Sequence, residues 1–321
     1  MPAIPTSDDI LAAAERVKPH IHRTPVLTCR AIDGMVGAEI FFKCENFQKA
    51  GAFKFRGAAN AVFSLTEEEA ADGVATHSSG NHAAALALAA RTRGVKAYVV
   101  MPRTAPQVKK DAVAGYGAEI TFCEPTLAAR EQTLAKVIGS TGAAVVHPYN
   151  DYRIIAGQAT AALELTEDVA DLDIVMTPIG GGGLACGTAL YVKYSRPQTK
   201  VIAAEPMGAD DAFRSYQSGT LIPSENPKTI ADGLLTSLGD KTFPIVTEFL
   251  DDIVTVSEEG IIEAMRCIWE RMKIVVEPSA VVPLGALLTG RLDAASKRIG
   301  VILSGGNVDL GRLPWPGGQT S

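Results

Sequence analysis

The sequence predicts an α/β protein built on parallel sheets. Short apolar runs rich in β-branched residues alternate along the chain with longer, alanine-rich segments of helical pattern. The apolar runs are nearly continuous, which is typical of strands covered on both faces of a parallel sheet. Glycine- or serine-rich turns follow several of these runs directly, and in open α/β sheets such turns gather where ligands bind.

The expected elements follow from these patterns in chain order. Strands are predicted where apolar and β-branched residues run together, at 39–44 (EIFFKC), 73–78 (GVATHS), 97–101 (AYVVM), 118–122 (AEITF), 143–147 (AAVVH), 173–178 (DIVMTP), 200–204 (KVIAA) and 298–303 (RIGVIL). Helices are predicted where alanine and apolar residues recur with helical spacing, among them 81–93, 106–115, 127–139, 183–195 and 257–273. The first residues also carry a helical pattern.

Four turns at predicted strand ends indicate one shared site. They are "SSGNH" at 78–82, "PIGGGG" at 178–183, "AEP" at 204–206 and "LSGGN" at 303–307. The carboxyl ends of parallel strands lie at one edge of a sheet, so we expect these turns to meet.

Composition narrows the class of protein. The 321 residues, 47% of them hydrophobic, are enough for a large buried core. A net charge of -6 without any basic block argues against nucleic-acid binding. Five cysteines, an odd number without a C-x-x-C pair, argue against a disulfide framework or a structural zinc site. The N-terminus lacks the pattern of a secretion signal and no segment has the ~18 apolar residues of a membrane span, so we expect a cytoplasmic protein.

Four consecutive glycines, Gly180 to Gly183, lie between an apolar strand and a helical segment. Glycine lets neighbouring backbone N–H groups converge, and the start of a helix adds positive potential, so the turn suits a phosphate. The pattern is neither an ATP-binding P-loop nor a dinucleotide fingerprint, which favours a monophosphate. A merely flexible turn is the alternative.

Lys54 stands in "GAFKFRG" between two phenylalanines. Partial burial at a turn into a helix would make its ammonium costly and lower its pKa, whereas a surface lysine would keep an ordinary one. The turn "HSSGNH" at 77–82 on its own suits a helix cap. A phosphate cradle together with a reactive amine is, however, what pyridoxal phosphate bound as a Schiff base requires.

Seven motifs resemble, in order, those of serine racemases and biosynthetic-type threonine/serine dehydratases, the fold type II pyridoxal-phosphate enzymes: "GAFKFRGA", "THSSGNH", "PIGGGGLACG", "EPMGADD", "IADG", "ERMKIVVEPSA" and "LSGGNVD". The resemblance runs from "HRTPV" at 22–26 to "GGNVD" at 305–309. It implies a tryptophan synthase β-like fold of two parallel-sheet domains with the cofactor between them. The large cofactor-binding domain would comprise 1–68 and 150–321, the small mobile domain 69–149, and the molecule would be a homodimer.

The same resemblance implies how the cofactor is held. Lys54 would form the Schiff base and later move protons at Cα, and Phe53 would lie against the ring. Asn81 would hydrogen-bond the ring 3′-oxygen, and Ser304 would face the pyridine nitrogen. The phosphate would bind the backbone of the glycine turn, formed by Gly180, Gly181, Gly182, Gly183 and Leu184.

Substrate and metal positions are implied as well. The turn of Ser78, Ser79, Gly80, Asn81 and His82 would receive the α-carboxylate. Ser79 matches the serine that acts opposite the lysine in racemases, and it could instead only bind carboxylate. Glu205 and Asp211, with the carbonyl of Ala209, match the divalent-cation site of this family. Their hard oxygen ligands suit Mg²⁺, Ca²⁺ or Mn²⁺. The alternative is that this segment is only a strand end followed by a capped helix. Glu277 is carried over as a residue near the site, with a structural role equally open.

The sequence departs from the common dehydratases at two places. "HPYNDYRIIAGQAT" at 147–160 carries Tyr149 and Arg153 near the expected substrate side, so both are candidates to bind the substrate. "IADGLLTSLG" at 230–239 has Leu235 and Thr236 where racemases tend to have lysine and serine. With "DDAFRS" and "GRLPW", this combination looks most like the bacterial β-hydroxyaspartate dehydratases.

The function predicted from this resemblance is a pyridoxal-phosphate-dependent lyase. It would eliminate water from a small β-hydroxy amino acid, foremost 3-hydroxyaspartate. A second substrate carboxylate needs a cation or several donors, for which Arg130 and Arg153 are candidates unless they are ordinary exposed helical residues. The alternatives are a threonine/serine dehydratase, a serine racemase and a noncatalytic pyridoxal-phosphate-binding protein.

Overall fold

The computed structural model describes residues 3–78, 80–105 and 107–315. Its strands are β1 (Val26–Leu27), β2 (Glu39–Cys44), β3 (Val74–His77), β4 (Ala97–Pro102), β5 (Glu119–Cys123), β6 (Ala144–Val145), β7 (Ile174–Pro178), β8 (Lys200–Pro206), β9 (Asp252–Val256) and β10 (Arg298–Leu303). Its α-helices are α1 (Ser7–Val17), α2 (Arg30–Val36), α3 (Lys54–Phe63), α4 (Glu67–Ala70), α5 (Asn81–Arg93), α6 (Gln107–Gly115), α7 (Leu127–Thr141), α8 (Tyr152–Asp168), α9 (Gly183–Ser195), α10 (Asp211–Ser218), α11 (Thr242–Phe249), α12 (Glu258–Met272) and α13 (Val282–Leu288). Short 3-10 helices η1 (Glu45–Phe47), η2 (Lys49–Gly51), η3 (Met207–Ala209), η4 (Asp232–Leu234), η5 (Pro278–Ala280) and η6 (Leu310–Arg312) join them.

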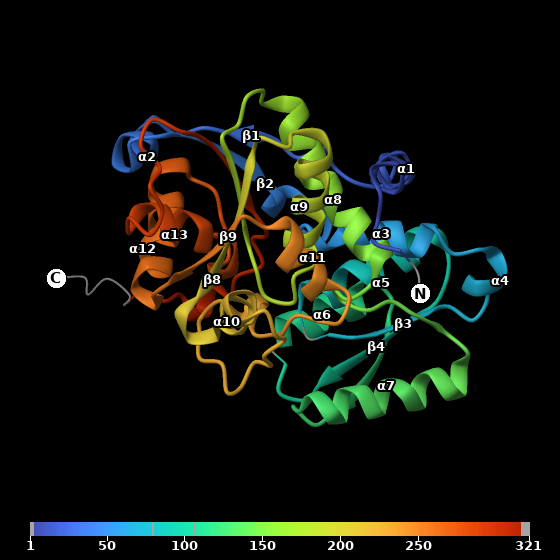
Figure 1. Cartoon of the computed structure of the whole chain (residues 1–321). Helices are drawn as coiled ribbons and strands as arrows, with labels where there is room; N and C mark the ends of the chain where they lie inside the picture. Colours follow the sequence, from blue (N-terminus) through green and yellow to red (C-terminus); the bar gives the residue numbers. More distant parts are fainter. Residues whose placement is uncertain (1–2, 79, 106, 316–321) are drawn as a thin grey trace.

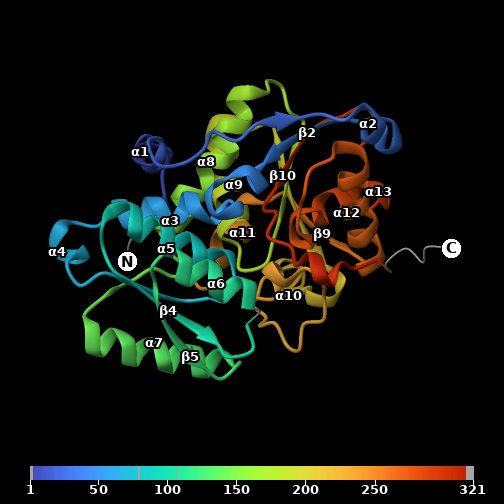
Figure 2. The ribbon, with the colours of Figure 1, turned by 180° about the vertical axis from the view of Figure 1, so that it is seen from behind.

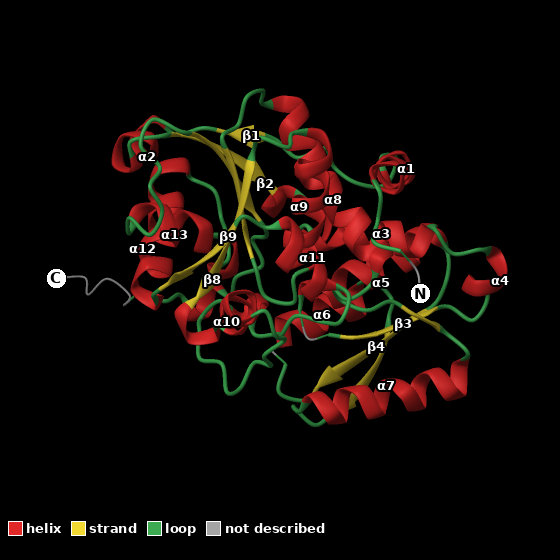
Figure 3. Ribbon diagram, in the orientation of Figure 1, coloured by secondary structure: helices red, strands yellow, loops and turns green. Residues whose placement is uncertain are grey.

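The strands form two sheets, which Figure 3 shows apart from each other in yellow. The first has the order β1-β2-β10-β7-β8-β9 and is parallel except for β1, and the second has the order β5-β4-β3-β6 and is parallel throughout. The α/β class and all eight predicted strands are thereby confirmed. Two strands were not expected from the sequence. β1 has only two residues, and β9 mixes polar with apolar residues at the edge of its sheet.

Helices cover both faces of the six-stranded sheet, as Figure 1 shows. Successive residues of a strand point to opposite faces, and the buried side chains of β10 follow this rule. Ile299, Val301 and Leu303 join the apolar cluster under α12 and α13, whereas Ile302 joins the cluster under α8 and α9. Burial on both faces explains why the sequence of this strand reads as a continuous apolar run.

Helix α3 lies between the two sheets. It packs against α8, which covers the first sheet, and against α5, which follows β3 of the second sheet; Figures 1 and 2 show it there from opposite sides. All four strands of the second sheet fall within residues 69–149, and the domain boundaries themselves stay a prediction. Within the described ranges, no helix has the length and apolar content to cross a membrane.

Candidate active site

The segment that leads into α3 lies against the end of β10. The backbone N–H of Phe53 donates to the carbonyl of Ser304 (2.9 Å), and Ala52 forms a β-bridge with Gly305. Two predicted site segments that are far apart in sequence therefore share one edge of the sheet. Ser304 is buried, and its backbone helps to hold the first turn of α3, where Lys54 stands.

Lys54 points into the molecule. Its Nζ donates to the carbonyl of Pro148 (2.9 Å) and lies 5.1 Å from the centroid of the Phe53 ring. Burial lowers the pKa of Lys54 to about 8, against the opposing effect of the Glu277 carboxylate. The sequence predicted this direction from the flanking phenylalanines. It did not predict Pro148 as the partner, because a backbone acceptor leaves no signature in residue types.

The glycine turn lies between β7 and α9 under the ring of Tyr149. A Cβ on Gly181 would lie 2.5 Å from that ring, and a Cβ on Gly180 would lie 2.8 Å from the Cα of Leu234. Gly182 has a φ of 89°, in the left-handed region that favours glycine. In the described part of the chain, the backbone N–H groups from Gly180 to Leu184 have no hydrogen-bond acceptor. This set of free donors at a helix start fits a phosphate group.

Asn81 is held at the start of α5 by two polar side chains. Its Nδ2 donates to the carboxylate of Glu277 (2.8 Å), and its Oδ1 accepts from the Nδ2 of Asn307 (3.0 Å). Burial raises the pKa of Glu277 to about 8, with Asp232 as a further negative neighbour. Glu277 is thus part of the candidate site, and Asn307, quoted only within a motif, is a site residue that the sequence did not single out.

These features fit pyridoxal phosphate. Lys54 offers an amine with a lowered pKa, and Pro148 and Tyr149 lie between it and the glycine turn. The amide of Asn81 and the buried Ser304 lie near the same edge. An amine, a phosphate cradle and polar groups for the ring are together what this cofactor needs.

Three histidines lie near Lys54. The ring of His147 lies edge-on to His77 (5.7 Å between centroids) and to Tyr149 (4.7 Å). His82 is buried, and its pKa falls well below the ordinary value because of burial and the nearby Lys54. Burial likewise lowers the pKa of His147 to about 4. Burial therefore favours the neutral form of His82 and His147, and a neutral ring does not repel a cationic amine.

The two candidate arginines differ. Arg153 is occupied, since its guanidinium contacts Asp151 (2.6 Å from Nη2) and the carbonyl of Val145 (3.1 Å). Arg130 lies near His77, whose pKa it helps to lower after burial. Its buried Nε has no hydrogen-bond partner in the described part of the molecule. Of the two, Arg130 is therefore the one with a guanidinium nitrogen that has no partner among the described residues.

Of the predicted carboxylate-binding turn, Ser79 lies outside the described residues. Ser78 and Gly80 are held together, since the Gly80 N–H donates to the Ser78 Oγ (3.3 Å). A cavity of ≈ 640 Å³ opens beside the turn and is lined by Gly80 and Asn81 among others. Beside this cavity, an ion pair between Lys109 and Asp232 joins α6 to η4.

The predicted metal positions lie at the end of β8. Glu205 and Asp211 are fully buried, and Glu205 accepts from the backbone N–H groups of Ala212 (3.1 Å) and Phe213 (2.8 Å). Both carboxylate oxygens of Asp211 are buried without a hydrogen-bond partner among the described residues. Burial raises the pKa of Glu205 to about 9 and that of Asp211 to about 6.

Two buried carboxylates that form no ion pair within 4.0 Å with a basic side chain of the described chain fit a cation. The carbonyl of Ala209, a buried residue of η3, would be the third ligand that the sequence predicted. Within the described residues, no group of three or more His, Cys, Asp or Glu side chains is arranged around a metal position, so backbone oxygens would have to complete the set.

Comparison with known proteins places these features in context. Residues 17–305 match the family model described as "Pyridoxal-phosphate dependent enzyme". The chain is 56% identical over 312 residues to the β-hydroxyaspartate dehydratase of Paracoccus denitrificans, covering 97% of this chain and 99% of that protein. It is 45% identical over 310 residues to the L-threo-3-hydroxyaspartate ammonia-lyase of Saccharomyces cerevisiae, covering 96% and 95%. The crystal structure of serine racemase from Dictyostelium discoideum superimposes with a TM-score of 0.92 at 50% identity, over 96% of this chain and 100% of that one.

Proposed function

The chain belongs to the family of pyridoxal-phosphate dependent enzymes, and we propose that it is a dehydratase of 3-hydroxyaspartate. It eliminates water from the substrate to give iminosuccinate, which water then hydrolyses to oxaloacetate and ammonia. The overall reaction is that of an ammonia-lyase acting on a small β-hydroxy amino acid.

The unpaired guanidinium nitrogen of Arg130 supports this substrate. A dicarboxylic amino acid needs a cationic partner for the carboxylate that serine and threonine lack, and a guanidinium binds carboxylate with two parallel hydrogen bonds. Among the described residues, Arg130 has its Nε buried and free near His77, whereas Arg153 is already occupied by Asp151. The two relatives that are named for hydroxyaspartate support the same substrate.

Different residues of the chain would bind the cofactor, move the proton and bind the substrate. The glycine turn would hold the phosphate of the cofactor, Asn81 a ring oxygen, and Ser304 the ring nitrogen. The bound cofactor supplies an acceptor for the electron pair that remains when a proton leaves Cα. Lys54 takes that proton, for which its lowered pKa suits it near neutral pH. The turn beside Ser78 binds the α-carboxylate.

The decisive experiment compares substrates and arginine variants. We expect the purified enzyme to release oxaloacetate and ammonia from a hydroxyaspartate stereoisomer with a higher kcat/KM than from serine or threonine. Arg130→Met removes a charge-assisted contact worth roughly 2–3 kcal/mol, so kcat/KM for hydroxyaspartate falls by a factor of roughly 30 to 150. Serine turnover stays nearly unchanged, because serine has no carboxylate for Arg130 to bind.

Arg153→Met is the matched control, since this arginine is already paired and should leave the hydroxyaspartate-to-serine ratio as it is. If Arg130→Met leaves that ratio unchanged, or the native enzyme prefers threonine or serine, a serine/threonine dehydratase replaces the proposal. Chiral analysis of unreacted serine reports racemisation, the activity named for the relative from Dictyostelium.

We also propose that Glu205, Asp211 and the Ala209 carbonyl bind a divalent cation such as Mg²⁺. The buried carboxylate of Asp211, unpaired within the described chain, supports this site. A homodimer and a cytoplasmic location stay predictions from the sequence.

A further inference from the structure

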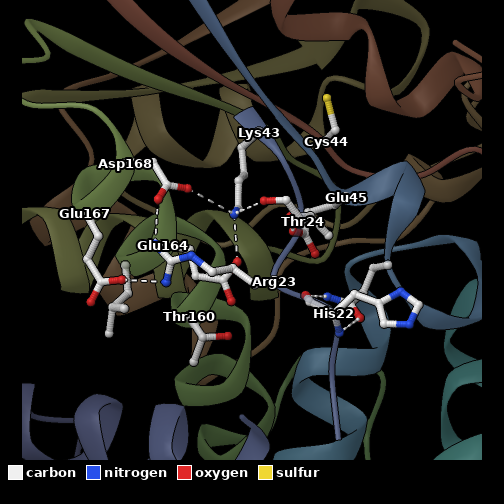
Figure 4. A network of polar contacts seen from close by, with 12 residues as sticks. His22, Arg23, Thr24, Lys43, Cys44, Glu45, Thr160, Glu164, Glu167 and Asp168 are labelled. Carbon is white, nitrogen blue, oxygen red and sulfur yellow. Dashed lines mark hydrogen bonds and ion pairs between the residues drawn. The ribbon is translucent and has the colours of Figure 1, made fainter. Parts of the chain in front are cut away.

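A cluster of buried charges lies on the side of α3 opposite the candidate active site. Arg56, Lys43 and Glu45 are completely buried and Glu164 nearly so. Figure 4 shows Lys43 at the centre, with the Thr24 carbonyl and Glu164 both at 2.7 Å from its Nζ. Two cationic and two anionic side chains thus face each other, and the carboxylate of Asp168 lies 4.0 Å from Lys43 at the edge of the cluster.

Arg56 connects the cluster. Its guanidinium binds Glu45 through two hydrogen bonds, from Nε (2.7 Å) and Nη2 (2.8 Å). It binds Glu164 through two more, from Nη1 (2.8 Å) and Nη2 (2.7 Å). Nη1 also donates to the Thr160 hydroxyl (3.2 Å). One planar side chain thus joins α3 to η1 on one side and to α8 on the other.

Arg56 and Lys54 both stand at the start of α3, which connects the buried cluster to the candidate active site. Residues two positions apart in a helix differ in side-chain direction by about 200°, so the side chains of Lys54 and Arg56 leave α3 on opposite sides. Lys54 reaches the Pro148 carbonyl while Arg56 reaches Glu45 and Glu164.

The start of α3 is also held by backbone hydrogen bonds, since the Phe53 N–H donates to the Ser304 carbonyl (2.9 Å) and the Gly57 N–H donates to the Oε1 of Gln158 (3.2 Å). Its N-cap residue, Phe53, makes no capping hydrogen bond with its side chain, and the first turn contains no acidic residue. The packing of Gly57 against α8 also sets how closely the two helices approach each other. Arg56 adds side-chain hydrogen bonds to η1 and to α8 at the same time, which the backbone bonds of this turn do not.

We propose that Arg56 is the positioning residue for Lys54, holding the first turn of α3 so that the amine stays at the Pro148 carbonyl. Buried ion pairs often stabilise a fold no better than packed apolar side chains, whereas their geometry is specific. A lysine at position 56 could not bind two carboxylates through parallel hydrogen bonds as the guanidinium does. The inference rests on the proposed role of Lys54 and extends it.

The test titrates Lys54 without any substrate. The full chain, freed of cofactor, is mixed with pyridoxal phosphate at a series of pH values and treated with borohydride, and peptide mass analysis measures the attachment rate at Lys54. We expect a half-maximal rate near pH 8 for the native chain, following the lowered pKa of Lys54. In Arg56→Lys the midpoint should move at least one pH unit upward, as the amine leaves its buried position. The kcat should fall at least tenfold with KM little changed.

Arg16→Lys is the matched control. Arg16 also binds α3, through the Asn60 side chain at 2.6 Å, but away from the helix start. It should leave both the midpoint and kcat unchanged. A native midpoint and kcat in a folded Arg56→Lys variant would overturn the proposal.

If circular dichroism shows that Arg56→Lys is unfolded, Glu45→Gln replaces it, because this variant keeps the shape of the cluster. It should shift the midpoint in the same direction, and an unshifted midpoint there also overturns the proposal. The titration needs no substrate, so it tests the positioning role of Arg56 even if the enzyme does not turn over hydroxyaspartate.

Discussion

At the scale of single residues, the site depends on how burial changes acid–base behaviour. The pKa of Lys54 is lower than that of a free lysine because its ammonium is desolvated, and the pKa of Glu277 is higher than usual because its carboxylate is buried. The neutral histidines His82 and His147 add no charge that would oppose a cationic lysine. The amine is therefore available as a base near neutral pH without a dedicated anionic partner.

We predict that Lys54→Ala abolishes dehydration. Alanine cannot take the Cα proton, whereas the N–H groups of the glycine turn remain, so the variant should still bind pyridoxal phosphate without a covalent bond. Product release with native and variant enzyme measures the first effect. Equilibrium dialysis with the cofactor measures the second. Turnover at the native rate would show that another group is the base.

At the scale of elements, the crossing of α3 and α8 sets where Lys54 and Arg56 lie. Gly57 and Gly157 face each other at this crossing, and a Cβ on Gly157 would lie 2.7 Å from the Cα of Gly57. It would also lie 2.8 Å from the carbonyl oxygen of Arg56. These are backbone atoms, which cannot rotate away as a flexible side chain could.

We predict that Gly157→Ala lowers the free energy of unfolding by about 1–3 kcal/mol, because the added methyl forces the two helices apart. Gly139→Ala is the control. Gly139 is exposed on α7, and among the described residues an added Cβ there would meet no atom of another element within 4 Å. Alanine at this position should therefore raise the stability by about 0.5–1 kcal/mol. Urea denaturation of both variants gives the two values, and equal stabilities would refute the packing argument.

At the scale of the whole molecule, strand ends from both sheets and the segment after β6 meet around Lys54. β10 brings Ser304, β7 brings the glycine turn, and β3 leads into the turn that contains Ser78. The Lys109–Asp232 ion pair joins α6, which follows β4 of the second sheet, to η4. Inside the larger sheet, β8 carries Glu205 between β7 and β9, so charge there affects the core of the molecule.

We predict that a chelator lowers the unfolding temperature of the native protein, because removing a divalent cation leaves the buried Asp211 carboxylate without its positive partner and Glu205, whose pKa is about 9, has to take up a proton. Asp211→Asn should start from the lower temperature and lose its response to chelator. Asp210→Asn is the neighbouring control, since Asp210 is paired with Arg214 at the surface and should keep the native response. Thermal unfolding with and without chelator measures all three proteins, and an unresponsive native protein would contradict the cation site.

The α/β class could be predicted from the sequence alone, because strands buried on both faces must be apolar throughout, and the sequence also predicted the turns that we propose to carry the chemistry. Glycines in a row, a lysine between phenylalanines and "SSGNH" are local signals that need no knowledge of contacts. The tertiary structure alone decided which residues meet. It brought Pro148 to Lys54, distinguished the occupied Arg153 from Arg130 with its free Nε in the described chain, and enclosed Arg56 between two carboxylates. Pairing and burial depend on chain segments far apart in sequence, and a residue type states its chemistry but not its neighbours.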